Sequence, residues 1–258
     1  MVIQNKKIIV FDLDGTLAES RCEIKSPMPE LLKKLLKIYK AGILSGGSFD
    51  QIISNVINKL DNDSSFNNLI LLPTCGSSFH SFNNNAWHQL YSVQLSEKDK
   101  LNIIEAITEC LGKVSFSIDK VWGEQFQDKG TQITFSALGD KSPTEIKKNW
   151  DIDFKKRSEL REAALLLLPN LEVKMGGTTS LDITNKGIDK AFGIKKIEEH
   201  LNINKDQILF VGDALIPGGN DYAVKEYGVD CISVNNPDDT IKVIRTILLA
   251  EEIKNGNV

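Results

Sequence analysis

Two aspartates directly follow a short apolar run near the start of the chain, in the stretch Ile-Ile-Val-Phe-Asp-Leu-Asp-Gly-Thr-Leu at residues 8–17. The apolar run is mostly β-branched, which is typical of a strand buried on both faces. In open α/β sheets ligands bind at the carboxyl ends of the strands, so Asp12 and Asp14 fall where chemistry is done. Two positions apart on an extended chain, they point to the same side. Because close like charges repel, the pair implies a bound cation, a shared proton or both.

The composition is that of an ordinary globular protein. Of the 258 residues 41% are hydrophobic and 26% are charged, and the formal net charge of −4 argues against a dedicated nucleic-acid binder. No apolar run approaches the roughly 20 residues that a membrane span needs. The first residues lack the apolar region of a secretion signal, and the four cysteines form no CxxC pair. We therefore expect a cytoplasmic protein with no nucleic-acid or membrane partner.

Strand and helix signals alternate at both ends of the chain, which predicts an α/β fold with a Rossmann-like parallel sheet covered by helices. Strands are expected at 8–11, 43–44, 69–72 and 208–211, and a helix is expected to run from Ser26 until Gly42 ends it. Between residues 82 and 183 the pattern changes to apolar and polar alternation, with strands expected at 114–118 and 132–136. We therefore expect a core of residues 1–81 plus 184–258 and an inserted α+β domain of residues 82–183.

A second acidic site follows a later strand. Asp213 comes directly after an apolar run, as Asp12 does, and Asn220 and Asp221 follow on a Gly-rich turn. If the two strands are parallel neighbours, both acids reach the same edge of the sheet. Carboxylates with few nitrogen or sulfur partners suit a hard cation such as Mg²⁺. The sequence therefore predicts a magnesium site at this edge.

Polar side chains that could bind a phosphoryl group are expected at the same edge. The hydroxyl of Ser45, at the end of the second strand, could donate to a phosphoryl oxygen. Ser48 is an alternative, although a helix cap formed with Gln51 explains it fully. Lys190, near the start of a helix, could bring a positive charge, and the helix N-terminus would add N–H donors. The combination indicates phosphoryl transfer.

A calcium loop is the alternative interpretation of the first motif, because Asp12, Asp14 and Glu23 occupy EF-hand positions. Leu17, however, stands where that loop needs a glycine, and a strand precedes the motif where an EF-hand has a helix. We therefore favour phosphoryl transfer.

The motif Asp12-Leu13-Asp14-Gly15-Thr16 resembles the first motif of the haloacid dehalogenase (HAD) superfamily of phosphoryl-transfer enzymes. Ser45, Lys190 and Asp213 stand in order at positions similar to the other three motifs. The inserted residues resemble the α+β cap of subfamily IIB. Within that group, the loop Gly-Asp-Ala-Leu-Ile-Pro-Gly-Gly-Asn-Asp at 212–221 is similar to that of the eukaryotic-type phosphomannomutases, as are the stretches at 46–48, 176–177 and 180–182.

The resemblance implies a role for each motif residue. Asp12 attacks the phosphoryl group to form an aspartyl-phosphate, and Asp14 acts first as acid and then as base. Asp12, the Asp14 carbonyl and Asp213 would bind Mg²⁺. Lys190 and either Ser45 or Ser48 would bind the phosphoryl group. Asn220 and Asp221 would support the metal and Lys190.

The cap residues bear on the outcome of the reaction. Phosphomannomutases grip the sugar and its distal phosphate with arginines, mostly in the cap, and with a Ser and an Asp. This chain keeps those three kinds of residue at Arg21, Ser180 and Asp182, but it has Lys129, Asp140 and Lys147 at the cap arginine positions. Lysine lacks the bidentate fork that suits a phosphate, and an aspartate repels it. Since a mutase must hold a bisphosphorylated intermediate, we expect a phosphatase of small phosphorylated metabolites such as sugar phosphates.

Two other functions stay open at this stage. The closest is a phosphohexomutase of the phosphomannomutase type. The other is a non-catalytic metabolite-binding protein of the same fold, against which the intact set Asp12, Asp14, Lys190 and Asp213 argues. The resemblance also implies a homodimer formed through the cap.

Overall fold

The computed structural model describes residues 5–60 and 64–254 and divides the chain into two compact units. The first unit consists of Met1–Ser92 and Asp189–Val258, and the second of Val93–Ile188. The boundaries expected at 81/82 and 183/184 fall inside the strands β4 (Ser78–Asn83) and β9 (Ser180–Asn185).

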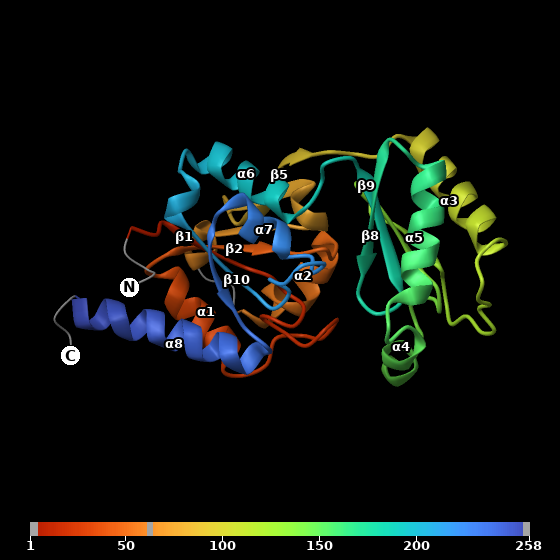
Figure 1. Ribbon diagram of the computed structural model, residues 1–258. Helices are drawn as coiled ribbons and strands as arrows, with labels where there is room; N and C mark the ends of the chain where they lie inside the picture. The colour runs from red at the N-terminus through yellow and green to blue at the C-terminus, as the bar shows by residue number, and fades with distance from the viewer. Residues whose placement is uncertain (1–4, 61–63, 255–258) are drawn as a thin grey trace. The chain divides into compact units, whose positions relative to one another are not determined.

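The first unit is built on one sheet, in which seven strands are found among the described residues. Besides β4 they are β1 (Ile8–Phe11), β2 (Lys40–Leu44), β3 (Leu69–Leu72), β5 (Ala86–Ser92), β10 (Ile208–Gly212) and β11 (Asp230–Ser233). They are ordered β11-β10-β1-β2-β3-β4-β5, with the first five parallel and β4 and β5 added as an antiparallel hairpin. The parallel sheet that the sequence predicts is therefore confirmed (Figure 1).

Helices cover both faces of this sheet (Figure 1). They are α1 (Met28–Leu36), α2 (Phe49–Asn55), α6 (Lys190–Leu201), α7 (Tyr222–Tyr227) and α8 (Pro237–Lys254), with 3-10 turns η1 (Ile57–Lys59), η2 (Ser64–Asn68), η3 (Thr74–Gly76) and η4 (Lys205–Gln207). Alternate side chains of β1 point to opposite faces. Ile9 and Phe11 pack in the cluster that contains α1, α2 and α8, and Ile8 and Val10 pack in the cluster that contains α6 and α7.

The helix expected to end at Gly42 ends earlier. It stops at Leu36, and Gly42 lies inside β2. A Cβ on Gly42 would lie 3.3 Å from Cγ1 of Ile70 and 3.4 Å from Cγ2 of Val10, so neighbouring strands leave little room for a side chain. The glycine therefore serves strand packing, and its interpretation as a helix terminator was wrong.

The second unit is an antiparallel sheet packed on helices. Its strands β6 (Phe126–Asp128), β7 (Gln132–Ser136), β8 (Leu171–Gly176) and β9 are ordered β6-β7-β9-β8, and its helices are α3 (Glu97–Leu111), α4 (Thr144–Trp150) and α5 (Lys155–Leu167). Ile133 and Phe135 of β7 pack with Ile103 of α3 and Leu160 of α5. The opposite side of β7 carries the polar residues Gln132, Thr134 and Ser136.

The strand expected at 114–118 is absent from the described structure, where that segment is irregular. Its side chains are held without strand pairing. The backbone N–H and the hydroxyl of Ser115 donate to the carboxylate of Glu159, at 2.7 and 2.6 Å, and the ring of Phe116 packs edge-on against Trp150. The strand at 132–136 is confirmed, but all five of its residues are buried, so neither of its faces is solvated.

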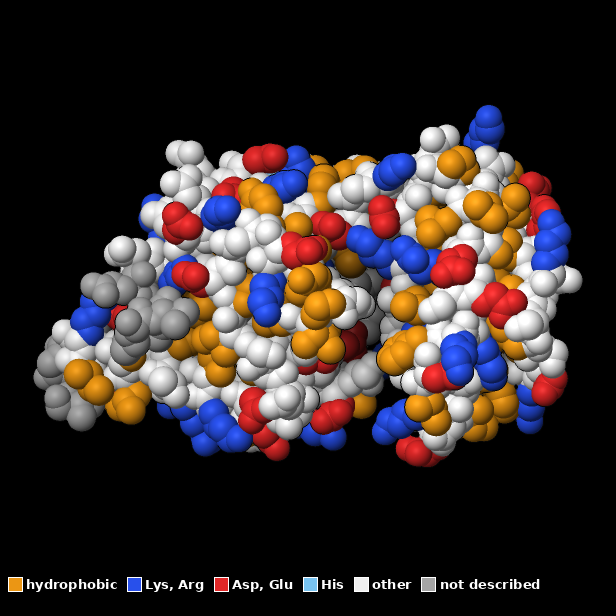
Figure 2. All heavy atoms as spheres, viewed as in Figure 1, with side chains coloured by type: hydrophobic (Ala, Val, Ile, Leu, Met, Phe, Trp, Pro, Cys, Tyr) orange, Lys and Arg blue, Asp and Glu red, His pale blue; other side chains and the backbone are white. Residues whose placement is uncertain are grey.

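Acidic and basic side chains are interspersed over the face that Figure 2 shows. Among the described residues, no helix is both long enough and apolar enough to cross a bilayer.

Candidate active site

The acids that the sequence singles out meet at the carboxyl edge of the parallel sheet. β1 and β10 are parallel neighbours with Phe11 opposite Val211, and the N–H of Asp12 donates to the carbonyl of Val211 at 3.0 Å. Asp12 and Asp213 therefore leave adjacent strands side by side. Asp221 joins them from the loop after β10, and one carboxylate oxygen from each of the three lies within 4.8 Å of the others.

Lys190 is the positive charge of this cluster. It is the first residue of α6, is fully buried, and donates to Oδ1 of Asp12 at 2.6 Å and to Oδ1 of Asp221 at 2.5 Å. The helix start is fixed by Asp189, whose carboxylate accepts the N–H of Phe192 at 2.8 Å. Burial alone would lower the pKa of Lys190, but the charges of Asp12 and Asp221 outweigh it and raise the pKa above its usual range. The two carboxylates therefore favour the charged form of the lysine.

The carboxylates are not fully compensated by this one lysine. Burial raises the pKa of Asp12 to about 8, with Lys190 opposing the shift and the charges of Asp221 and Asp213 adding to it. Burial and the charge of Asp221 also raise the pKa of Asp213. A further cation would relieve this excess of negative charge, and the all-oxygen donor set fits Mg²⁺. The residues present therefore fit the metal that the sequence predicts.

Asp14 lies beside this cluster but outside the group of three carboxylates. It is half-buried, and its Oδ1 accepts the backbone N–H of Arg21 at 2.6 Å. Arg21 itself is exposed. Gly15 lies in the turn that follows Asp14 and has a φ of +80°, and an added Cβ there would lie 2.4 Å from Oδ2 of Asp213. Only glycine fits there, because the motif and the Asp213 carboxylate are in direct contact.

Ser45 and Ser48 are separated by their hydrogen bonds. Ser45 is buried at the end of β2, and its Oγ accepts the N–H of Gly47 at 3.0 Å, which leaves its own O–H as a donor. Ser48 is the N-cap of α2 and accepts the N–H of Gln51 at 3.2 Å. The geometry therefore favours Ser45 as the donor to a phosphoryl group.

The loop after β10 is closed by Asp221. Its Oδ2 accepts the N–H of Ala214 at 3.1 Å, while its Oδ1 holds Lys190. Asn220, next to it, is exposed. Asp221 thus links the lysine to the backbone that carries Asp213.

Ser180 and Asp182 lie in the second unit, on the polar side of β9. The hydroxyls of Ser180 and Ser136 are 2.9 Å apart, and Oδ1 of Asp182 accepts from Nε2 of Gln132 at 2.7 Å and from Oγ1 of Thr134 at 2.6 Å. These β7 partners could not be identified from the sequence, because nothing in the chain showed that β7 and β9 are paired.

The three positions expected to replace cap arginines also lie in the second unit. Lys129 is in the turn between β6 and β7. Oδ1 of Asp140 accepts the N–H of Glu124 at 2.9 Å, and the Asp140 carbonyl accepts from Nζ of Lys147 at 2.9 Å. The side chains of Asp140 and Lys147 therefore bond to backbone groups of the second unit itself.

Comparison with known proteins decides the family. The family described as haloacid dehalogenase-like hydrolase matches residues 9–256, almost the whole chain. The chain belongs to the haloacid dehalogenase-like hydrolases. The resemblance predicted from the motifs is confirmed, and the protein is an enzyme of the hydrolase and phosphotransferase class.

The chain is also similar in sequence to named relatives and in fold to solved structures. The chain is 26% identical over 256 residues to the phosphomannomutase of Encephalitozoon cuniculi, covering 95% of this chain and 94% of the relative. It is 25% identical over 248 residues to that of Saccharomyces cerevisiae, covering 92% of each. Its fold is similar to that of IMP-bound Plasmodium falciparum IMP-nucleotidase, with a TM-score of 0.72, 18% identity, and coverage of 96% of this chain and 69% of that one. A haloacid dehalogenase-like hydrolase from Bacteroides thetaiotaomicron gives a TM-score of 0.65 at 17% identity, covering 94% and 99%.

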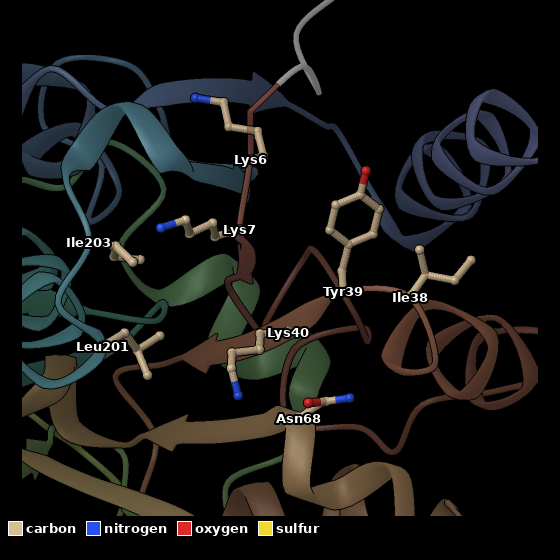
Figure 3. A pocket seen from close by; sticks show the side chains of 8 residues that line it. All are labelled: Lys6, Lys7, Ile38, Tyr39, Lys40, Asn68, Leu201 and Ile203. Atoms are coloured by element: carbon tan, nitrogen blue, oxygen red, sulfur yellow. The ribbon is translucent and has the colours of Figure 1, made fainter. Parts of the chain in front are cut away.

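A cavity of about 420 Å³ lies at the other edge of the hydrolase's parallel sheet, where the strands begin. Figure 3 shows its lining, which is Lys6, Lys7, Ile38, Tyr39, Lys40, Asn68, Leu201 and Ile203. None of the motif residues lines it. The cavity is therefore separate from the carboxylate cluster.

Proposed function

We propose that this haloacid dehalogenase-like hydrolase is a phosphatase that hydrolyses a small phosphorylated metabolite such as a sugar phosphate. The observation that carries the proposal is the buried bridge in which Lys190 joins Asp12 to Asp221, beside Asp213. This bridge holds Asp12 in place by one oxygen, so that its carboxylate is oriented as a nucleophile next to a fixed positive charge.

In the proposed reaction Asp12 is the nucleophile, and Asp14 is the acid and then the base. A carboxylate oxygen of Asp12 forms a bond to phosphorus as the ester bond to the leaving oxygen breaks, and Asp14 gives that oxygen its proton. Asp14 then takes a proton from water, which attacks the aspartyl-phosphate, releases phosphate and restores Asp12. The N–H of Arg21 holds Oδ1 of Asp14, which leaves Oδ2 for the proton transfers.

The carboxylates of Asp12, Asp213 and Asp221, with the carbonyl of Asp14, are the groups that would hold Mg²⁺. When bound, the ion would neutralise negative charge on the phosphoryl oxygens. Lys190 adds its charge to the same place, and Ser45 orients the phosphoryl group by donating its hydroxyl proton.

Residues of the second unit favour hydrolysis over mutase activity. At a position where the resemblance to phosphomannomutases implies a phosphate-binding arginine, the chain has Asp140, whose carboxylate accepts the N–H of Glu124 and would repel a phosphate. Ser180 and Asp182 offer hydrogen bonds suited to hydroxyl groups. These contacts support a substrate with one phosphate and a hydroxyl-bearing remainder.

One assay separates phosphatase from mutase. The enzyme is incubated with Mg²⁺ and the 1- and 6-phosphates of mannose and glucose, with and without a hexose bisphosphate, and both free phosphate and sugar-phosphate isomers are measured. We expect phosphate release that needs no bisphosphate and that Asp12→Asn abolishes. Isomer interconversion without phosphate release would instead establish the mutase, which the full-length similarity to phosphomannomutases favours.

We also propose that the enzyme works in the cytoplasm on a small-molecule substrate, with no nucleic-acid or membrane partner. The interspersed charges of the chain support this.

A further inference from the structure

A strained turn adjoins the candidate active site. In η3, after β3, three successive residues have left-handed backbone angles, with φ of 48° at Thr74, 58° at Cys75 and 82° at Gly76. Residues other than glycine adopt this conformation at a cost and keep it only where surrounding contacts impose it. The contacts of η3 therefore show what the turn holds in place.

On one side η3 is bonded to the loop that carries Ser45. The N–H of Thr74 donates to the carbonyl of Gly47, and the N–H of Cys75 donates to the carbonyl of Ser45, both at 2.8 Å. The turn thus fixes both ends of the short segment in which the Ser45 hydroxyl lies.

On the other side η3 meets the first turn of α6 with no side chain between the two backbones. A Cβ on Gly76 would lie 2.4 Å from Cα of Gly193. A Cβ on Gly193 would lie 2.6 Å from Cδ1 of Leu44 and 3.3 Å from the carbonyl oxygen of Cys75. At Gly76 there is no room for a side chain unless the helix moves away from the turn. At Gly193 a side chain would have to displace the δ-methyl of Leu44 and press against the carbonyl oxygen of Cys75.

The contact bears directly on Lys190. Gly193 follows Lys190 by three residues, so both lie on the same side of the helix. The depth at which α6 approaches the sheet therefore sets where Nζ of Lys190 reaches between Asp12 and Asp221. A glycine inside a helix lowers its stability relative to alanine, so helix formation alone gives no reason for Gly193.

We infer that Gly193 is a positioning residue: its close backbone contact with η3 seats α6 so that Lys190 bridges Asp12 and Asp221. This inference rests on the proposed role of Lys190 in phosphoryl transfer. The same turn holds the Ser45 loop, so η3 keeps the lysine and the serine in register with each other.

The test is a double-mutant cycle on Mg²⁺-dependent hydrolysis of p-nitrophenyl phosphate by the full chain. Gly193→Ala is expected to lower kcat by roughly tenfold or more, because small displacements of catalytic groups are costly. In the Lys190→Ala background the same substitution is expected to cost no further activity, since it acts through the lysine. Gly112→Ala is the control, because a Cβ there meets only the carbonyl oxygen of Glu109 at 3.5 Å, and it should leave kcat unchanged.

Several outcomes would overturn the inference. Full activity of Gly193→Ala, or an equal loss with and without Lys190, shows that Gly193 does not act through the lysine. If Lys190→Ala keeps wild-type activity, the proposed function itself is contradicted. Failure of the proposed function can therefore be told apart from failure of the inference about Gly193. If Gly193 has a purely structural role, Gly193→Ala lowers thermal stability, and its effect on kcat does not depend on Lys190.

A second background guards against misfolding of the single variant. Leu44→Ala removes the atoms nearest to the added Cβ, so Gly193→Ala should cost clearly less kcat there than in the wild-type chain. An equal loss of kcat in both backgrounds contradicts the steric argument.

Discussion

At the scale of single residues, Lys190 carries the electrostatic balance of the site. It is fully buried and compensates two carboxylates that are themselves buried, Asp12 and Asp221. Removing one partner of such a network leaves uncompensated charge away from water, which is costly. The lysine is therefore expected to matter for folding as well as for catalysis.

Lys190→Met is expected to lower the free energy of unfolding by about 3–5 kcal/mol and kcat by roughly a hundredfold or more. Thermal unfolding and phosphate release measure the two effects. Mg²⁺ should recover part of the lost stability, because it compensates the same carboxylates. Lys37→Met, at an exposed lysine, is the control and should change neither quantity. Unchanged stability of Lys190→Met would contradict the bridging role.

The position of this cluster was predictable from the sequence. Asp12 and Asp213 each end an apolar strand, and parallel pairing is enough to bring them together. The choice between Ser45 and Ser48 could not be made from the chain, because both hydroxyls stand in the same short loop. Only the N–H groups that they accept separate a helix cap from a site residue.

A chelator is expected to abolish phosphate release, and excess Mg²⁺ to restore it. Asp213→Asn should raise the Mg²⁺ concentration for half-maximal activity by roughly tenfold or more, since a carboxylate that would bind the metal is lost. Asp206→Asn, at an exposed aspartate outside the cluster, serves as the control. Full activity in excess chelator would refute the metal assignment.

At the scale of elements, the hairpin of β4 and β5 extends the parallel sheet and contains a buried histidine. His80 stacks on Phe49 with ring centroids 4.2 Å apart, and burial lowers the pKa of the imidazole below its ordinary 6.5. In the unfolded chain the proton binds at the higher pKa. Stability from the neutral ring is therefore present above about pH 6.5 and is lost as the pH falls below it.

His80→Phe is expected to keep the stacking and to reduce the loss of thermal stability between pH 7 and pH 5. His88→Gln, at an exposed histidine of β5, should leave the pH dependence as it is. Thermal unfolding over this pH range measures both variants. An unchanged pH dependence of His80→Phe would show that the buried imidazole contributes nothing to acid sensitivity.

Elements were predictable where one pattern was decisive. The buried strands β1, β3 and β10 appear as expected. The segment 114–118 has the alternating apolar and polar residues of a strand but forms none. Ser115 instead bonds to Glu159, and Phe116 packs against Trp150. Local alternation shows that alternate side chains are buried, but it does not show whether another strand is available to pair with.

At the scale of the whole molecule, the two units divide the work that we propose. The carboxylate cluster, Lys190 and Ser45 all belong to the unit of Met1–Ser92 and Asp189–Val258, whereas Ser180 and Asp182 belong to Val93–Ile188. Each unit has its own apolar cluster. We therefore propose that the second unit is a cap that selects substrate without taking part in the chemistry.

Replacing Val93–Ile188 by a short Gly/Ser linker tests this division. The shortened chain is expected to keep Mg²⁺-dependent hydrolysis of p-nitrophenyl phosphate, because all the proposed catalytic groups remain. It should lose its preference among sugar phosphates. Asp12→Asn in the shortened chain controls for contaminating phosphatase. A folded but inactive shortened chain would show that the second unit contributes to catalysis.

The same shortened chain tests the expected homodimer. We propose that the chain pairs through the second unit, because that unit exposes large apolar side chains such as Leu101 of α3 and Leu166 of α5, which are 63% and 83% exposed. Light scattering coupled to gel filtration is expected to give a dimer for the full chain and a monomer for the shortened one. If the shortened chain is still a dimer, the first unit holds the interface. In the full chain Leu166→Glu should weaken a cap interface that includes α5, because burying an unpaired carboxylate is unfavourable.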